Sequence, residues 1–199
     1  MKVVLATTNP GKLRELKALA TGEGWLELVL APEGFNPDET GKTFIENAKI
    51  KATAAARMTG TMSVADDSGL IVEALNGRPG IHSARYCEGT DEDRRNKLLN
   101  ELAKTPDDRR QAAFMCAMAV ADPDGSIAYT AIRFWEGMIT LEARGNSGFG
   151  YDPIFQPLNK KFTAAELDPE EKNRVSHRGQ AWNQVLSFLR QQHQQLTRT

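Results

Sequence analysis

The chain has 199 residues, of which 40% are hydrophobic and 26% are charged, and its formal net charge is −1. That length fits one domain, or one domain split into two lobes around a cleft. The near-neutral charge argues against nucleic acid as the main partner, because proteins that bind the phosphate backbone usually carry a basic excess. A small phosphorylated ligand is not excluded, since it needs only a local cationic pocket.

The N-terminal segment and the cysteines both predict a cytoplasmic protein. The apolar run at residues 2–7 is too short for the core of a signal peptide, and no apolar stretch is long enough to span a membrane. Cys87 and Cys116 lack the spacing of a metal site and suggest no disulfide framework.

Strand and helix patterns alternate along the chain, which predicts an α/β fold with a mixed central sheet and flanking helices. The expected strands cover 2–7, 25–30, two short segments on either side of Asp66-Asp67, 111–121, 126–135 and a last one near 138–142. The expected helices follow the turn at 8–11, run from Thr43 to about Met58, cover 91–104, and begin near Ser176. Thr43 and Glu46 have the spacing of a capping box. We expect a single domain over residues 1–199, with a frayed polar tail over about 191–199.

Two adjacent acids, Asp66 and Asp67, and the hydroxyl of Ser68 stand between apolar, strand-like flanks. Burying carboxylates beside a sheet core is costly unless a cation compensates, and oxygen ligands on a rigid strand end suit Mg²⁺ bound alongside phosphates. The alternative is an Asp-Ser-Gly turn between two strands, where these residues are expected for backbone reasons alone. From this segment alone, both interpretations stay open.

A second candidate site is the turn at residues 7–12, which holds Thr7, Thr8, Asn9, Pro10, Gly11 and Lys12. A glycine-containing turn, the start of a helix and a lysine are typical of an anion site. An ordinary Asn-Pro-Gly turn that caps a helix explains the same residues. The segment is neither a Walker A loop nor a dinucleotide fingerprint.

Two further charged residues flank the predicted capping box. Glu39 precedes it and is a candidate to join Asp66 and Asp67 in a metal site, although a solvated loop acid is the commoner outcome. Asn47 and Lys51 are one turn apart on the following helix and share a face. Lys51 is either a phosphate ligand or a solvent-exposed lysine.

The segment 147–155 predicts a close approach of the backbone to a flat ligand. Glycines flank Phe149, whose ring is suited to stacking on a base. Tyr151 and Phe155 are expected in the core.

Polar residues gather at the start of the last predicted helix. Ser176, His177 and Arg178 place several donors at a positive helix end, where they would face an anionic or carbonyl-rich group. A cap serine followed by exposed charges is the alternative.

Six motifs follow one another in a single order. They are ATTNPGK at 6–12, TFIENA at 43–48, ADDSGL at 65–70, PGIHSARY at 79–86, FGYDPIF at 149–155 and EEKNRVSHRG at 170–179. In this order the chain resembles the inosine/xanthosine triphosphate pyrophosphatases, the Ham1/RdgB-like family, over almost its whole length to about Leu189. The family usually has glycine where this chain has Thr8.

The resemblance implies an elongated α/β fold with two lobes around a substrate cleft, a homodimer, and Mg²⁺-dependent hydrolysis of ITP, dITP, XTP and dXTP to the monophosphate and pyrophosphate. It implies that Glu39 and Asp67 hold the metal and that Asp67 is the catalytic base. The implied triphosphate ligands are Thr7, Thr8, Asn9, Pro10, Gly11, Lys12 and Lys51, with Ser68 also touching substrate. The implied base and sugar contacts are Phe149, Gly150, Tyr151, Asp152, Lys172, His177 and Arg178.

The expected chemistry agrees with this resemblance. Attack of water on the α-phosphorus needs a base and cations that spread the charge of the leaving pyrophosphate. No cysteine or serine nucleophile with a histidine partner is evident, so we expect no covalent intermediate. Two alternatives remain, a Maf-like pyrophosphatase with a different base preference and a non-catalytic nucleotide-binding protein. The FGYD and SHR segments argue against the first, and the presence of all three acids argues against the second.

Overall fold

A computed structural model describes residues 1–198 of the chain, and the last residue of the predicted tail, 199, lies outside the described part. The described helices are α1 (Pro10–Leu19), α2 (Phe44–Thr59), α3 (Asp91–Glu101), α4 (Pro169–Val175) and α5 (His177–Leu196). The strands are β1 (Lys2–Leu5), β2 (Glu27–Leu30), β3 (Ser63–Val72), β4 (Gln111–Ala121), β5 (Ile127–Ile139) and β6 (Phe155–Pro157). Within residues 1–198, no helix is both long and apolar enough to cross a membrane.

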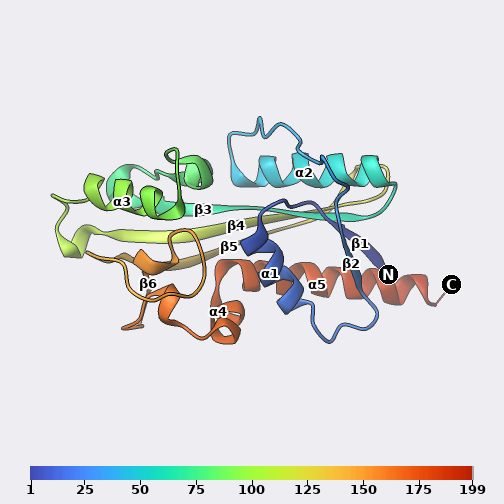
Figure 1. Cartoon of the computed structure of the whole chain (residues 1–199). Helices are drawn as coiled ribbons and strands as arrows, with labels where there is room; N and C mark the ends of the chain where they lie inside the picture. Colours follow the sequence, from blue (N-terminus) through green and yellow to red (C-terminus); the bar gives the residue numbers. More distant parts are fainter. Residues whose placement is uncertain (199) are drawn as a thin grey trace. The chain divides into compact units, whose positions relative to one another are not determined.

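The strands form one sheet in the order β2-β1-β3-β4-β5-β6. β1 pairs in parallel with both β2 and β3, whereas β5 and β6 pair antiparallel. A mixed sheet with helices confirms the predicted α/β fold (Figure 1).

The chain divides into two compact units, which are described separately. Unit 1 comprises 1–67, 116–133 and 178–199, and unit 2 comprises 68–115 and 134–177. The divisions fall inside β3, β4 and β5 and just after the first residue of α5.

In unit 1, alternate residues of each strand face different helices. Val3 and Leu5 share a buried cluster with Trp182 and Val185 of α5. The opposite face packs against α2, and the hydroxyl of Ser63 donates to the carbonyl of Ala52 over 2.6 Å (Figure 1). This second interface is made largely of buried alanines, namely Ala48, Ala52, Ala55 and Ala56 of α2 with Ala6, Ala65, Ala117, Ala119 and Ala121 of the sheet side. Small side chains let the helix approach the strands closely.

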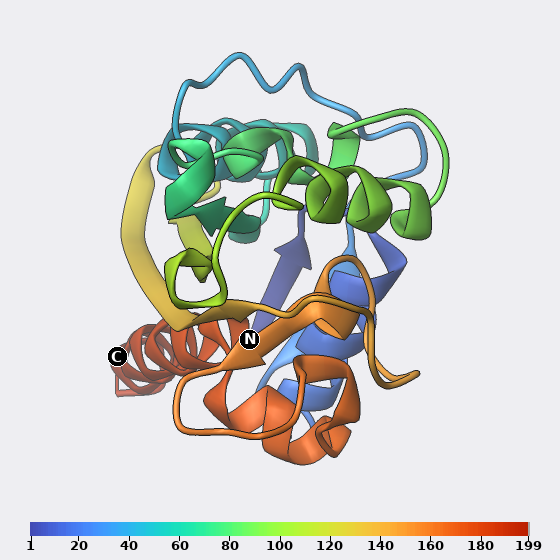
Figure 2. The same cartoon turned by 90° about the vertical axis from the view of Figure 1, so that its left-hand side faces the viewer.

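Unit 2 has its own buried cluster, in which Leu98 of α3 and Phe155 of β6 join residues of β3, β4 and β5. Arg95 of α3 donates to the carbonyl of Gly150 over 2.8 Å. In Figure 2 the orange segment that leads into β6 accordingly lies beside the green helix α3.

Several predicted elements differ from the structure, four of them in ways that bear on the site or on the core. β3 runs unbroken through Asp66 and Asp67, so the prediction of two separate short strands was wrong, and the alternative of a turn between them is excluded. Lysine and arginine side chains contact the two acids and let the strand continue. The strand expected near 138–142 is the end of β5. α3 ends at Glu101, and α5 continues to Leu196. Helix α5 extends into the predicted frayed tail because the ring of His193 stacks on Trp25, with centroids 5.3 Å apart.

The alanine interface of α2 generates a stability prediction. Ala52 is fully buried, so the larger side chain of Ala52→Leu overpacks the contact between α2 and the sheet and lowers the free energy of unfolding by about 1–3 kcal/mol. Ala54→Leu, at a half-buried position of the same helix, is the matched control and changes it by less than about 0.5 kcal/mol. Urea unfolding of the three proteins measures both values, and equal losses would contradict the close packing of this face.

Candidate functional site

The centre of the candidate site in unit 1 is a pair of buried carboxylates on β3. Asp66 is 2% exposed and Asp67 is 8% exposed. Lys12 Nζ lies 3.0 Å from Asp66 Oδ2, and Arg178 Nε lies 3.4 Å from the same oxygen. Because charges buried without partners are very costly, these two cations are what permits Asp66 to remain in the strand.

Helix α1 begins in a way that fixes the position of Lys12. The side chain of Asn9 accepts hydrogen bonds from the backbone N–H groups of Gly11 (2.9 Å) and Lys12 (3.1 Å), and Pro10 occupies the first turn. The backbone N–H of Asn9 in turn donates to Thr7 Oγ1 over 3.2 Å. The predicted Asn-Pro-Gly helix cap is therefore confirmed, whereas anion binding by this turn stays a prediction.

Asp67 is contacted by two side chains of α2. Asn47 Nδ2 donates to Asp67 Oδ2, and Lys51 Nζ lies near Asp67 Oδ1, both over 3.3 Å. Lys51 Nζ also pairs with Glu39 Oε1 at 2.8 Å. The loop that carries Glu39 is tied to α2 because the N–H of Gly41 donates to Asn47 Oδ1 over 2.8 Å. Glu39 is therefore not a solvated loop acid, and Lys51 is not a solvent-exposed lysine. Both belong to one ionic cluster with Asp67.

The pKa values of this cluster move in directions that follow from its burial. Burial raises the pKa of Asp67, and the nearby ammonium groups of Lys51 and Lys12 only partly oppose that rise. Burial lowers the pKa of Lys51, but the carboxylates of Asp67, Asp66 and Glu39 outweigh it, so the net shift is upward. A carboxylate with a raised pKa is suited to accept a proton near neutral pH.

Arg178 is held by acids from two elements of unit 1. Its Nη1 pairs with Glu15 of α1, and its Nε pairs with Asp66. Burial alone would lower the pKa of Arg178, but Glu15 and Asp66 reverse the effect and raise it. Two hydrogen-bonded contacts fix the plane of the guanidinium.

The donor set of Glu39 and Asp67 fits a hard divalent cation. Both carboxylates already converge on one cationic group, the ammonium of Lys51. Mg²⁺ is usually bound by one or two carboxylates, with water and substrate phosphates as the other ligands. Among residues 1–198, no group of three or more histidine, cysteine, aspartate or glutamate side chains is arranged to hold a metal by itself. The two carboxylates therefore suit a cation that phosphates help to bind.

The candidate site in unit 2 is a tightly bonded loop around Phe149. Asp152 Oδ2 accepts from the backbone N–H of Phe149 (2.8 Å) and pairs with Lys172 Nζ (2.7 Å). Lys172 Nζ lies 5.2 Å from the centroid of the Phe149 ring. Gly148 has a φ of +77°, and a Cβ there would collide with the carboxylate of Asp152. The sequence therefore needs glycine at this position to close the loop over its aspartate.

The remaining predicted residues of unit 2 are mostly in its interior. Tyr151 is 5% exposed and its hydroxyl donates to the carbonyl of Ser83, and Phe155 is fully buried, so the core prediction for both is confirmed. The ring of His177 is buried and stacks on Phe114, with centroids 4.9 Å apart and planes 7° apart. Ser68 is half-buried on β3.

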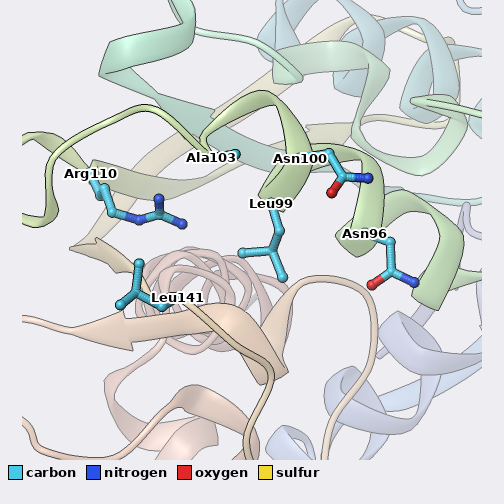
Figure 3. Close-up of a pocket in the computed structure, with 6 residues that line it drawn as sticks. All are labelled: Asn96, Leu99, Asn100, Ala103, Arg110 and Leu141. Carbon is cyan, nitrogen blue, oxygen red and sulfur yellow. The ribbon is translucent and has the colours of Figure 1, made fainter.

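A pocket of about 470 Å³ in unit 2 contains none of the predicted site residues. It is lined by Asn96, Leu99, Asn100, Ala103, Arg110 and Leu141 (Figure 3). Its charged member, Arg110, donates to three backbone carbonyls, each over 2.9 Å. One of these is the carbonyl of Leu102, which follows α3, so the guanidinium serves the fold at this point.

Sequence reasoning missed several residues that organise the two sites. Glu15 follows Lys12 by three residues on α1. Residues with this spacing share a helix face, and this could have placed Glu15 near the site. Asn47 had been placed on the same face as Lys51 without a partner. Asp91 and Arg95 of α3 gave no signal, because the loop that they contact is more than fifty residues away in the sequence.

The raised pKa of Asp67 generates a prediction on stability. A carboxyl whose pKa is higher in the folded state contributes fully to stability below its ordinary pKa of 3.8. That contribution is lost as the pH rises through the raised pKa. The side chain in Asp67→Asn does not titrate, so at pH 8 this variant should have a higher free energy of unfolding than the wild type. The difference between the two proteins should shrink as the pH falls toward 5. Urea titrations at several pH values measure the margin, with Asp38→Asn in an exposed loop as the control for charge removal. A margin that grows on acidification would contradict the burial argument.

Comparison with known proteins agrees with these motifs. Residues 3–188 match the model of the Ham1 family. The chain is 50% identical over 197 residues to a dITP/XTP pyrophosphatase of Salmonella typhimurium, a match that covers 95% of this chain and 98% of the relative. It is 48% identical over 184 residues to a dITP/XTP pyrophosphatase of Nostoc sp., covering 92% of each. The solved structure of a HAM1 protein from Coxiella burnetii matches with a TM-score of 0.85 at 42% identity, covering 96% of this chain and 99% of that one. The chain therefore belongs to the Ham1 family.

Proposed function

We propose that this protein is a dITP/XTP pyrophosphatase, which hydrolyses the triphosphates of deaminated purines to the monophosphate and pyrophosphate. The observation that carries the proposal is the 50% identity, over 95% of the chain, to relatives that bear this name. The reaction removes deaminated purines from the nucleotide pool. The family resemblance adds two expectations, a cytoplasmic location and a homodimer.

Asp67 is proposed as the catalytic base. In the reaction a water oxygen forms a bond to the α-phosphorus, the bond from that phosphorus to the bridging β-oxygen breaks, and pyrophosphate leaves. The proton of the water passes to Asp67, whose raised pKa favours its acceptance. Asn47 and Lys51 hold the two carboxylate oxygens of Asp67 in place.

The charge balance of the unit 1 cluster supports a need for a divalent cation. Three cations, Lys12, Lys51 and Arg178, contact four carboxylates, those of Glu15, Glu39, Asp66 and Asp67. With all groups ionised the cluster has one excess negative charge, which would repel a triphosphate. Mg²⁺ held by Glu39 and Asp67 would reverse that sign and stabilise the charge of the leaving pyrophosphate.

The turn that begins α1 is proposed to meet the phosphates. Thr7, Thr8 and Asn9 supply polar side chains there, Pro10 and Gly11 shape the backbone, and Lys12 adds a charge whose side chain is still 12% exposed. Lys51 has the same role from α2. Ser68, next to the proposed base, is a further substrate contact.

The loop in unit 2 is proposed to meet the purine and its sugar. Phe149 offers an aromatic face, and Gly150, Tyr151 and Asp152 shape the loop that carries it. Lys172 and His177 are the proposed donors of unit 2, and the family resemblance adds Arg178 of unit 1. A donor aimed at the carbonyl oxygen at C6 is left unpaired by adenine, which has an amino group there, at a cost of about 1–3 kcal/mol. Such a site rejects ATP strongly.

The first test concerns the products. Incubation with dITP or XTP and Mg²⁺ should release pyrophosphate and the nucleoside monophosphate, and excess EDTA should remove most of the activity. Anion-exchange chromatography separates pyrophosphate from orthophosphate at early times. Orthophosphate as the first product, or full activity in EDTA, would contradict the proposal.

The second test concerns the base. Asp67→Asn keeps the size of the side chain but removes the charge that accepts the proton, so kcat should fall by about 10²–10⁴-fold at saturating Mg²⁺. Lost affinity for the metal would add to this loss. Asp38→Asn is the control and should retain wild-type kcat. A variant at position 67 with more than about a tenth of the wild-type kcat would exclude Asp67 as the base.

A further inference from the structure

One residue of the Phe149 loop, Gly150, is held at both of its backbone polar groups by a single helix. The backbone N–H of Gly150 donates to Asp91 Oδ2, and Arg95 Nη1 donates to the carbonyl of Gly150, each over 2.8 Å. Asp91 and Arg95 are four residues apart on α3 and therefore share one face. We call these two side chains the α3 clamp.

The N-terminus of α3 does not need the clamp. The capping box that starts α3 consists of Thr90 and Asp93, which satisfy one another's backbone N–H groups. Asp91 is instead directed to Gly150 and to Arg94, whose Nη2 lies 3.2 Å away. Residue 150 has a φ of +60° and would have open space around a Cβ, so the loop has no side-chain packing at this point. At Gly150 the loop is therefore held by the hydrogen bonds of the α3 clamp and not by side-chain packing.

Phe149 is consequently fixed on both sides along the chain. Its own N–H donates to Asp152 Oδ2, and the next peptide unit is held by the clamp. The same Asp152 oxygen pairs with Lys172, whose ammonium lies over the Phe149 ring. A shift of the Gly150 peptide would therefore move the aromatic ring relative to Asp152 and Lys172.

We infer that Asp91 and Arg95 are positioning residues that set the base-binding loop of the enzyme. They act through the Gly150 peptide and do not touch the substrate. The inference rests on the proposed function, since it assigns the Phe149 loop to the purine. Binding energy from the base should depend on the clamp, whereas the phosphate chemistry of unit 1 should not.

The kinetic test compares KM with kcat. Asp91→Ala and Arg95→Met should each raise KM for dITP about five- to tenfold, which corresponds to about 1–1.4 kcal/mol, and leave kcat within about twofold. Inorganic tripolyphosphate, which has no base, should inhibit the variants with the wild-type inhibition constant. Because both side chains hold the backbone of the same residue, Gly150, the double variant should lose less than the product of the two single effects.

Matched variants separate positioning from a general loss of structure. Asp91→Asn and Arg95→Lys keep an acceptor and a donor at these positions and should restore most of the affinity. Glu92→Ala removes the neighbouring acid from the first turn of α3, and Arg109→Met removes an exposed arginine. Both controls should keep wild-type KM.

Hydrogen exchange tests the clamp without activity. The peptide that covers residues 143–155 should exchange faster in Asp91→Ala than in wild type, and at the wild-type rate in Glu92→Ala. If the wild type is active but the clamp variants keep the wild-type KM, the positioning role is overturned and the proposed function is not. The same holds if tripolyphosphate inhibition weakens in the variants as much as dITP binding does. An inactive wild type overturns the proposed function and this role with it, while the exchange rates still report whether the clamp holds the loop.

Discussion

The buried carboxylates of β3 are the constraint on which the organisation of unit 1 depends. A strand that carries two adjacent acids in its interior requires cations at fixed positions. Lys12 supplies one from α1, Lys51 supplies another from α2, and Arg178 supplies a third from the start of α5. Each helix of unit 1 is therefore tied by charge to the strand that it packs against. The helix caps become part of the site, because the Asn9 cap and the Thr43 capping box determine where α1 and α2 begin.

At Asp67, the proposed catalytic base, burial lowers the stability of the fold but favours acceptance of a proton. Burial raises the pKa of Asp67 against its ordinary value, so the ionised form that a catalytic base needs is also the form that the fold disfavours. Lys51 and Asn47 limit the cost without removing it. A better-paired carboxylate would be more stable but a weaker proton acceptor.

The sequence predicted most of the elements but few of the interactions of the site. Periodicity and capping signals located α1, α2, α3 and α5, because these signals depend on residues within a few positions of each other, whereas α4 was not predicted. The sequence predicted two short strands around Asp66-Asp67 and left a turn between them open, because local preferences allow a turn there and the cations that contact the acids lie far away in the chain. Arg178 and Glu15 are 163 positions apart, and no local pattern could have joined them. Only the ordered motifs of the family brought these segments together.

The two candidate sites differ in charge as the two ends of a nucleotide do. In unit 1, ammonium, guanidinium and carboxylate groups converge where a phosphate chain and its cation would be bound. In unit 2, the charge of Lys172 is neutralised by Asp152, so the Phe149 loop offers an aromatic face with little net charge. An uncharged purine gains from stacking and from hydrogen bonds to such a surface. If the loop meets the base as proposed, selectivity depends on how firmly the loop presents its donors, and the fixation of the Gly150 backbone by α3 would then contribute to specificity.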